Sequence, residues 1–205
     1  MRIETFTGGI FDTNCFLLPD YGILIDAPQD AADWLARTGD KVALLLLTHG
    51  HIDHVVDAAR IKQEHGCRVG YHRDSIPLLT DRNFFKQFGF GWEIEPVAAD
   101  FLIAETERTE FGGLAFRVLE VPGHCPGSLC FFASAERVLF GGDVLFAGGV
   151  GRWDLPGGDG DLLFAGIRDK VLPLGDDVRV LPGHGPATTI GVERRTNPYL
   201  ATGSD

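Results

Sequence analysis

Short runs of apolar residues predict an antiparallel opening to the chain. Three of them predict strands at residues 2–7, 14–18 and 22–26, with turns at Gly8-Gly9 and Pro19-Asp20 between them. Asp30 is then placed to cap a helix that runs to about Thr38. An entirely apolar run at 42–47 follows and predicts a buried strand. This strand–helix–strand unit favours a sheet covered by helices.

The remainder of the chain continues to mix strands and helices. A helix over 55–64 is expected to stop at Gly66, and a strand follows at 68–71. Five further strands are predicted at 101–103, 108–111, 114–120, 128–133 and 137–141, with a hairpin at Gly112-Gly113. The last predicted elements are a helix from Asp159 or Asp161 to Lys170, a strand at 178–181 and a helix at 190–196. The pattern predicts an α/β chain (α+β by some schemes) with a second sheet.

The composition is typical of one folded domain over residues 1–205, since 44% of the residues are hydrophobic and no run resembles a linker. A net charge of −11 at pH 7 argues against nucleic acid as a partner, because phosphates are neutralised by clustered cations. The sequence begins without a secretory signal and has no apolar run of the ~18 residues that a membrane span needs, so we expect a cytoplasmic protein without a membrane partner. The four cysteines lack framework spacing and are expected to be thiols.

Residues 80–96 form an aromatic stretch without a clear period. Its aromatic side chains are Phe84, Phe85, Phe88, Phe90 and Trp92, with glycines at 89 and 91. Such a stretch either folds over a cleft as a lid, where it would exclude water and bind an apolar acyl or sulfur-bearing group, or it covers the edge of the sheet. The sequence leaves both alternatives open.

A dense group of metal-binding residue types follows the apolar run at 42–47. The segment Thr48-His49-Gly50-His51-Ile52-Asp53-His54 contains three imidazoles and a carboxylate within six residues. It stands at the C-terminal end of a buried strand, where open α/β sheets bind ligands. Imidazole and carboxylate suit borderline divalent metals such as zinc, and the absence of Cys from the segment favours a catalytic over a structural site. His65 and His72 lie outside this pattern and are expected to be structural.

Three more candidate ligands follow other predicted strands. The segments 121–127 and 181–187 both contain Pro-Gly-His, a tight turn that presents His124 and His184 at a strand end. Asp143 leaves its strand through two glycines. The five histidines and two aspartates would give two metal ions about four protein contacts each if one carboxylate bridges them.

These segments resemble the metallo-β-lactamase superfamily, and the resemblance covers nearly the whole chain from Thr48 onward. It implies a four-layer αββα sandwich with metals at one edge between the sheets. Three segments are similar to the small glyoxalase II-like hydrolases of bacteria: Gly142-Asp143-Val144-Leu145-Phe146, Gly149-Val150-Gly151-Arg152 and Gly191-Val192-Glu193-Arg194-Arg195-Thr196-Asn197-Pro198. Lactamases of this fold usually place a Cys where this chain has Asp143, so the resemblance to glyoxalase II is closer.

The resemblance also implies roles for individual residues. His49, His51 and His124 would hold the first metal ion, Asp53, His54 and His184 the second, and Asp143 would bridge them. Arg152 would bind substrate near the carboxylate of its thiol part, and Asp53 would also act catalytically by holding the attacking proton.

The implied activity is hydrolysis of a thioester such as S-2-hydroxyacylglutathione by a hydroxide that bridges two divalent ions. Zinc is expected, with iron and manganese open. One alternative is a persulfide dioxygenase of the same superfamily, with a single iron on His49, His124 and Asp143. The alternative from another class is a metal-binding module without catalysis. The sequence leaves the oligomeric state open.

Overall fold

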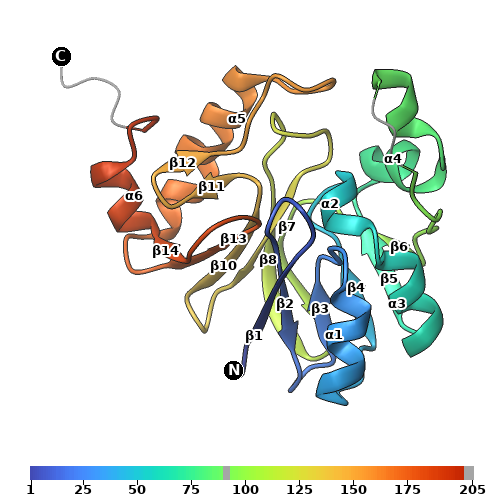
Figure 1. Cartoon of the computed structure of the whole chain (residues 1–205). Coiled ribbons are helices and arrows are strands. Elements are labelled where there is room, and N and C mark those ends of the chain that lie inside the picture. Colours follow the sequence, from blue (N-terminus) through green and yellow to red (C-terminus); the bar gives the residue numbers. More distant parts are fainter. Residues whose placement is uncertain (90–92, 201–205) are drawn as a thin grey trace.

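Two six-stranded sheets face each other in the computed structural model of the chain, and helices cover their outer faces (Figure 1). The structure describes residues 1–89 and 93–200. Phe90, Trp92 and the side chain of Phe88, all part of the predicted aromatic stretch, lie outside the described part. The four layers confirm the predicted αββα sandwich and its mixed α/β class.

The first sheet is built from the N-terminal part of the chain. In spatial order its strands are β1 (Glu4–Gly8), β2 (Thr13–Leu18), β3 (Ile23–Ile25), β4 (Leu44–Leu46), β5 (Arg68–Tyr71) and β6 (Phe101–Leu102). The first three pair antiparallel, which confirms the predicted opening. From β3 to β6 the pairing is parallel, as the predicted strand–helix–strand unit requires.

The second sheet is built from the C-terminal part. In spatial order its strands are β14 (Thr188–Thr189), β13 (Arg179–Pro182), β10 (Val138–Gly142), β9 (Leu129–Ala133), β8 (Leu114–Glu120) and β7 (Thr106–Phe111). The predicted hairpin joins β7 to β8 through Gly112 and Gly113, whose φ angles of 57° and 86° suit glycine. A parallel pairing of β10 with β13 places the ends of these two strands at the same edge.

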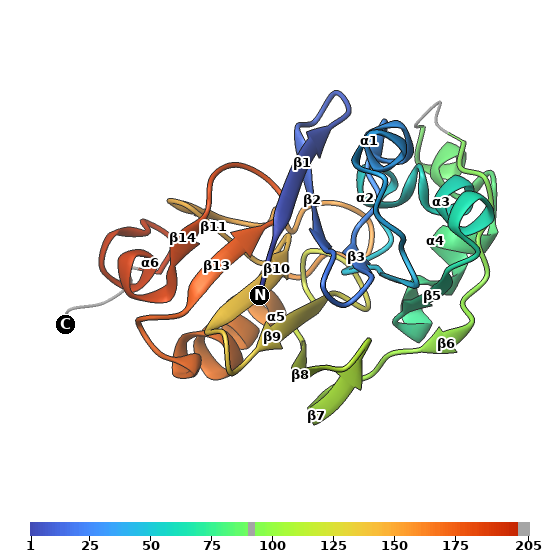
Figure 2. The same cartoon turned by 90° about the horizontal axis from the view of Figure 1, so that it is seen from below.

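The helices form two groups on opposite sides of the sheets, as Figure 2 shows. The group beside the first sheet contains α1 (Ala31–Thr38), α2 (Ile52–Val55), α3 (Ala58–His65), η1 (Arg73–Ser75), α4 (Ile76–Thr80) and η2 (Phe84–Phe88). The group beside the second sheet contains α5 (Gly160–Gly166), η3 (Ile167–Val171), η4 (Leu172–Leu174) and α6 (Ile190–Thr196).

Two details of the predicted helices are wrong. Asp30 does not cap α1 with its side chain; the carboxylate of Asp57 instead accepts a hydrogen bond from the backbone N–H of Ala32 at 2.9 Å. This contact also explains why the helix predicted over 55–64 is divided into α2 and α3, because Asp57 stands at the break between them. At the start of α5 the cap is Asp159, which accepts from the N–H of Leu162.

Alternating side chains of β2 pack in two different layers of the core. Phe16 and Leu18 of β2 pack between the two sheets, whereas Cys15 and Leu17 pack against the helices beside the first sheet. All six residues of β2 are buried, as expected for a strand covered on both faces. A third cluster, between the second sheet and α5, completes the sandwich.

The strands β4, β8, β10 and β13 all end at one edge, where loops from the two sheets meet. Backbone hydrogen bonds link these loops: the N–H of Leu129 donates to the carbonyl of Thr48 at 2.8 Å, and the N–H of Asn14 donates to Gly183 at 2.7 Å. A small hairpin of β11 (Leu145–Phe146) and β12 (Gly149–Val150), which the sequence pattern did not predict, lies next to this edge. Among the described residues, no helix is both long and apolar enough to span a bilayer.

Candidate metal centre

The loop after β4 carries four of the predicted site residues in a compact turn. Residues 48–50 lead directly into α2, so Asp53 and His54 lie on the first turn of that helix. Gly50 is needed here because a Cβ at this position would lie 2.8 Å from the Cβ of Leu78. The tight turn therefore depends on the glycine within the histidine motif.

Three other strand ends bring the remaining predicted residues to this loop. His124 follows β8, Asp143 follows β10 and His184 follows β13. The approach is close: a Cβ at Gly183 would lie 2.2 Å from Oδ1 of Asp143. The structure thus brings together, from four separate regions, all seven side chains predicted to bind metal. These seven, which form the metal group, are His49, His51, Asp53, His54, His124, Asp143 and His184.

The side chains form one continuous group of nitrogen and oxygen atoms. His51 Nδ1 lies 2.8 Å from His124 Nε2. The Oδ1 atom of Asp143 lies 3.2 Å from His54 Nε2, and its Oδ2 atom lies 3.5 Å from His124 Nε2 and 3.3 Å from His184 Nε2. The Oδ2 atom of Asp53 lies 3.2 Å from His184 Nε2 and 3.5 Å from His54 Nε2. The two oxygens of Asp143 therefore face both halves of the group.

Three sets of donor atoms in this group are compact enough to hold a metal ion, with all atoms of a set within 4.8 Å of one another. The sets are His49, His51 and His124; His49, His54 and Asp143; and Asp53, His54 and His184. Three buried atoms of the group have no hydrogen bond of good geometry within the described part of the chain: His49 Nε2, His54 Nε2 and Asp143 Oδ1, although the last two lie 3.2 Å apart. Buried polar atoms without partners are costly, and a bound cation would satisfy all three. The residues therefore fit the metal ions that the sequence predicts.

Hydrogen bonds on the far side of four of the five rings fix which nitrogen faces the group. In four rings the Nδ1 atom contacts an oxygen atom. The partner of His49 is the hydroxyl of Thr48 at 3.1 Å, and that of His54 is a carboxylate oxygen of Asp26 at 2.8 Å. The partner of His124 is the carbonyl of Arg152 at 2.7 Å, and that of His184 is the carbonyl of Phe11 at 2.9 Å. Such contacts select the tautomer with a free Nε2. His51 differs, because its Nδ1 atom faces His124.

Asp26 is a site residue that the sequence reasoning missed. It is 2% exposed and has the left-handed backbone φ of 61°. Its carboxylate accepts hydrogen bonds from the N–H of Thr48 at 2.8 Å and from the Thr48 hydroxyl at 2.8 Å, in addition to the ring of His54. A signal was present: Asp26 directly follows β3, the parallel neighbour of β4, so it reaches the same edge as the histidine loop.

Burial keeps three of the histidines neutral, His49, His51 and His124, because it lowers the pKa of each ring. Burial lowers the pKa of His49 well below its ordinary value, and the nearby rings of His54 and His51 lower it further. Burial, together with the neighbouring His124 ring, lowers the pKa of His51 to about 3. A neutral imidazole has a free lone pair, so these rings need lose no proton before they bind a cation.

The other half of the group carries charge in the metal-free protein. Burial opposes a charge on His54 and His184, but Asp143 and Asp53 outweigh it, so the pKa of His54 lies well above its ordinary value and that of His184 rises to about 10. Burial alone would raise the pKa of both carboxyls, yet these histidines hold each pKa below its usual range. Protons thus occupy the positions that a second cation would take.

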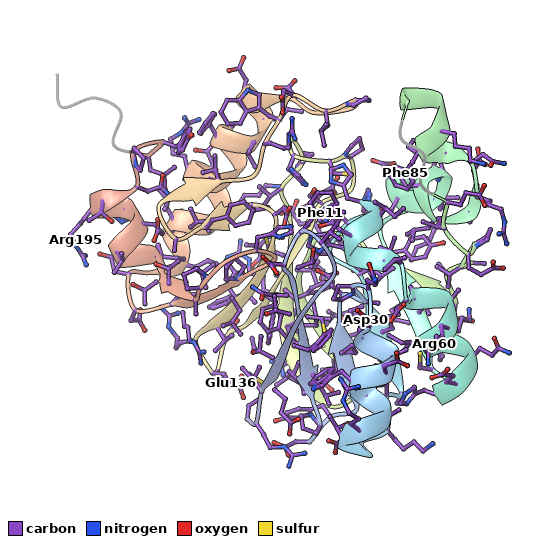
Figure 3. All side chains as sticks on the ribbon, viewed as in Figure 1. Phe11, Asp30, Arg60, Phe85, Glu136 and Arg195 are labelled. Atoms are coloured by element: carbon purple, nitrogen blue, oxygen red, sulfur yellow. The ribbon has the colours of Figure 1, made fainter. Side chains whose placement is uncertain are left out.

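A cleft of about 600 Å³ opens directly onto this group. It is bounded by metal-group residues and mainly apolar side chains, namely Phe11, His51, Ile52, Asp53, Leu78, Phe84, Phe85, His124, Pro126, Asp143, Arg152, Leu155, Pro156, Gly157 and His184. In Figure 3, Phe11 lies near the centre of the view and Phe85 on the helices to its upper right, whereas Glu136 lies away from both at the lower left. Part of the aromatic stretch therefore forms a cleft wall, while its function as a moving lid stays a prediction.

Arg152 lines the cleft, as its predicted contact with substrate requires. Its guanidinium makes two hydrogen bonds to the carboxylate of Asp154, at 2.8 and 2.9 Å, and 61% of its side chain is exposed. Because its carbonyl also accepts from His124, Arg152 links the cleft wall to the metal group.

The histidines outside the group have local structural contacts. Nδ1 of His72 accepts from the N–H of Asp74 and caps η1. Nδ1 of His65 accepts from the N–H of Val42 at 3.3 Å. These contacts agree with the structural function expected for both residues.

Comparison with known proteins identifies the family. The sequence profile of the metallo-beta-lactamase superfamily matches residues 8–184. Hydroxyacylglutathione hydrolase GloC of Haemophilus influenzae is 38% identical over 208 residues, which cover 98% of this chain and 98% of that protein.

Solved structures give the same result. BLEG-1 B3 metallo-beta-lactamase has a TM-score of 0.90 and 35% identity, with 98% of this chain and 100% of that chain covered. TTHA1623 in a di-iron-bound form has a TM-score of 0.85 and 36% identity, and the match covers 96% of this chain and 100% of that chain. The shared sandwich and the match in sequence over most of its length lead to one conclusion: the chain belongs to the metallo-beta-lactamase superfamily, a superfamily of metal-dependent hydrolases.

Proposed function

We propose that the protein hydrolyses thioesters with two divalent metal ions held by the seven-residue group. The position of Asp143 is the observation that carries this proposal. Its Oδ1 atom lies 3.2 Å from Nε2 of His54 and its Oδ2 atom lies 3.5 Å from Nε2 of His124, so one carboxylate reaches both halves of the group. In this arrangement His49, His51 and His124 would hold one ion, Asp53, His54 and His184 the other, and Asp143 would bridge them.

Such ions, zinc by preference and iron or manganese as alternatives, would supply a water-derived nucleophile near neutral pH and polarise a carbonyl oxygen. The chain itself contributes orientation and proton transfer. Oδ2 of Asp53 accepts from the Thr13 hydroxyl at 2.8 Å and contacts His184 at 3.2 Å, so a proton released during hydrolysis would be held on Oδ1. Asp53 lines the cleft, within reach of a bound substrate.

The thioester is supported by the likeness to GloC, whose name describes hydrolysis of hydroxyacylglutathione. A thiolate leaves readily, so the reaction requires little help from a general acid. The open cleft beside the metal group also supports an enzyme with a small-molecule substrate over a metal-binding module.

The test combines metal analysis with a screen of substrates. Purified protein loaded with zinc, iron or manganese would be assayed on lactoylglutathione, other thioesters, lactones, a phosphodiester and a β-lactam. We expect about two bound ions per chain and the fastest turnover on a thioester. Faster turnover of another ester class by fully loaded protein would refute the proposal.

The alternative is a persulfide dioxygenase with one iron on His49, His124 and Asp143. Among the described residues, the compact donor sets combine His49 with His124 or with Asp143, but none contains all three. The iron alternative also leaves His54 and His184 without a purpose, although both rings are oriented toward the group. Oxygen consumption with a persulfide substrate separates the two activities.

A further inference from the structure

The cleft beside the metal group has apolar walls on more than one side. Leu78 and Phe85 are only 7% and 6% exposed, because their other faces pack in the core beside the first sheet. Leu155 and Pro156 come from the loop before α5, beyond Arg152. Since the first pair also packs in the core, this apolar surface is already in place before a substrate binds.

The same cleft offers little to a carboxylate. Apart from the imidazoles of the metal group, Arg152 is the one cationic side chain among the described lining residues, and Asp154 already accepts two hydrogen bonds from it. Leu155, the next lining residue, lies beside this ion pair in the sequence and adds no charge. A carboxylate that entered here would compete with Asp154 for the guanidinium or stay unpaired.

A smaller cleft of about 310 Å³ shares Phe11, Ile52 and Asp53 with the larger one and likewise offers little to a carboxylate. Its described lining includes Glu93 and contains no cation. The basic residues near Glu93 are Lys86 and Arg82, and both form ion pairs with acidic side chains, Lys86 with Glu93 and Arg82 with Glu95. Apart from the metal group itself, the described lining of neither cleft therefore includes an unpaired cationic side chain.

We propose that the substrate carries an uncharged apolar group, alkyl or aryl, that fills the larger cleft, and that thioesters of this class are preferred over glutathione thioesters, whose thiol part bears carboxylates. This inference rests on the proposed thioester hydrolysis and specifies its substrate class. Each methylene buried against this wall is expected to raise kcat/KM by about fourfold. A carboxylate in the same place lowers it, because the group loses water without gaining a partner.

The experiment compares two series with the metal-loaded protein. In the first, the acyl chain of a neutral thioester is lengthened from acetyl to hexanoyl; in the second, one acyl group is carried by a neutral alkyl thiol or by glutathione. We expect kcat/KM to rise with chain length and to be at least about tenfold higher for the neutral thiol. A flat series, or preference for the glutathione thioester, would overturn the inference while leaving thioester hydrolysis in place.

Binding of inert analogues makes the two proposals separable. The affinities of a neutral dialkyl thioether and of the corresponding S-alkylglutathione would be measured by calorimetry on the same metal-loaded protein. If no thioester is hydrolysed but the neutral thioether binds about tenfold more tightly, the proposed function fails and the apolar character of the cleft stands. If S-alkylglutathione binds more tightly, the inference fails.

A charge introduced into the wall tests the inference in the opposite direction. Leu155→Lys places a cation in the cleft and should narrow the advantage of the neutral thioester over the glutathione thioester by about fivefold or more. Leu162→Lys on α5, where the leucine is 50% exposed and does not line the cleft, is the matched control and should leave the ratio unchanged. An unchanged ratio in Leu155→Lys, with normal metal content, counts against the inference.

Discussion

The imidazole of His54 donates a hydrogen bond from Nδ1 to Oδ2 of Asp26 over 2.8 Å, and both side chains are almost completely buried. The contact turns Nε2 of the ring toward the metal group, where it lies 3.2 Å from Asp143. Asp26 also accepts from the backbone and the hydroxyl of Thr48, so one carboxylate positions a proposed ligand and the start of the loop that carries it. The arrangement of the metal group thus depends on a residue that contacts His54 on the side of the ring away from the proposed metal ions.

We expect Asp26→Asn to weaken metal binding about 10- to 100-fold, because the amide cannot accept all three hydrogen bonds and the His54 ring loses its fixed orientation. Competition with a chromogenic chelator measures the change. Asp30→Asn is the matched control: Asp30 has the same left-handed backbone conformation but is exposed, so this variant should leave the metal affinity unchanged. Equal affinities for the two variants would contradict the positioning function of Asp26.

Removal of a proposed ligand should reduce metal content and turnover together. For His184→Ala we expect metal affinity to fall by at least about 100-fold and kcat/KM to fall with it, because a direct ligand matters more than an orienting contact. Elemental analysis and a thioester assay on the same preparation measure both. His65→Ala removes a histidine that accepts a hydrogen bond from the backbone of Val42 and belongs to none of the compact donor sets among the described residues, so its metal content should be that of the parent protein. Full activity of metal-depleted His184→Ala would remove this residue from the proposed site.

Metal affinity should rise with pH. In the metal-free protein the hydrogen bonds to Asp143 and Asp53 overcome burial and raise the pKa of His184 to about 10, and the pKa of His54 is raised as well. Both rings therefore keep a proton near neutral pH, which a cation must displace, and this competition weakens as pH rises toward the raised pKa. Each displaced proton changes the apparent affinity by up to about tenfold per pH unit. Calorimetric titration of zinc in buffers of different ionisation enthalpy counts the released protons, and a count of zero would contradict the assigned charges.

The sequence predicted the metal group but not Asp26, the residue that orients it, because the histidine motif is local in the sequence whereas the contact of Asp26 depends on the fold. His49, His51, Asp53 and His54 lie within six residues and are chemically unusual, so their pattern is visible without a fold. The contact of Asp26 with His54 exists only because β3 and β4 align in parallel, with Ile25 opposite Leu46.

Predictions from local helix propensity also failed where a contact with a distant residue determines the backbone conformation. The pattern over 55–64 favours one helix, but Asp57 accepts from the backbone of Ala32 in α1 and the helix is interrupted there. The strands β11 and β12 contain two residues each, too few for an alternating pattern to be recognised.

Release of Arg152 from its ion pair should increase the use of anionic substrates. Both hydrogen bonds from the guanidinium go to Asp154, and the pair is largely exposed. We expect Asp154→Asn to raise kcat/KM for a glutathione thioester relative to a neutral one by about two- to fivefold, the range of an exposed ion pair. The double variant Asp154→Asn with Arg152→Ala should return the ratio to the parent value. An unchanged ratio in the single variant would show that Arg152 does not contact the thiol part of the substrate.

A small steric change should disable the metal group without removing any of its residues. A Cβ at Gly183 would lie 2.2 Å from Oδ1 of Asp143 and 2.6 Å from Cε1 of His54, so Gly183→Ala must push apart the two side chains that connect the halves of the group. We expect loss of at least one bound ion and a fall in kcat/KM of about 100-fold or more, with the fold retained, because overpacking of this size costs about 1–3 kcal/mol. Gly141→Ala is the control: its Cβ would come no closer than 3.5 Å to another atom, although the residue stands in β10 only two positions before Asp143. Circular dichroism of the two variants tests whether the fold is retained, and their metal content and turnover test the effect on the site. A fully loaded, active Gly183→Ala protein would mean that Asp143 and His54 need not be adjacent for the site to function.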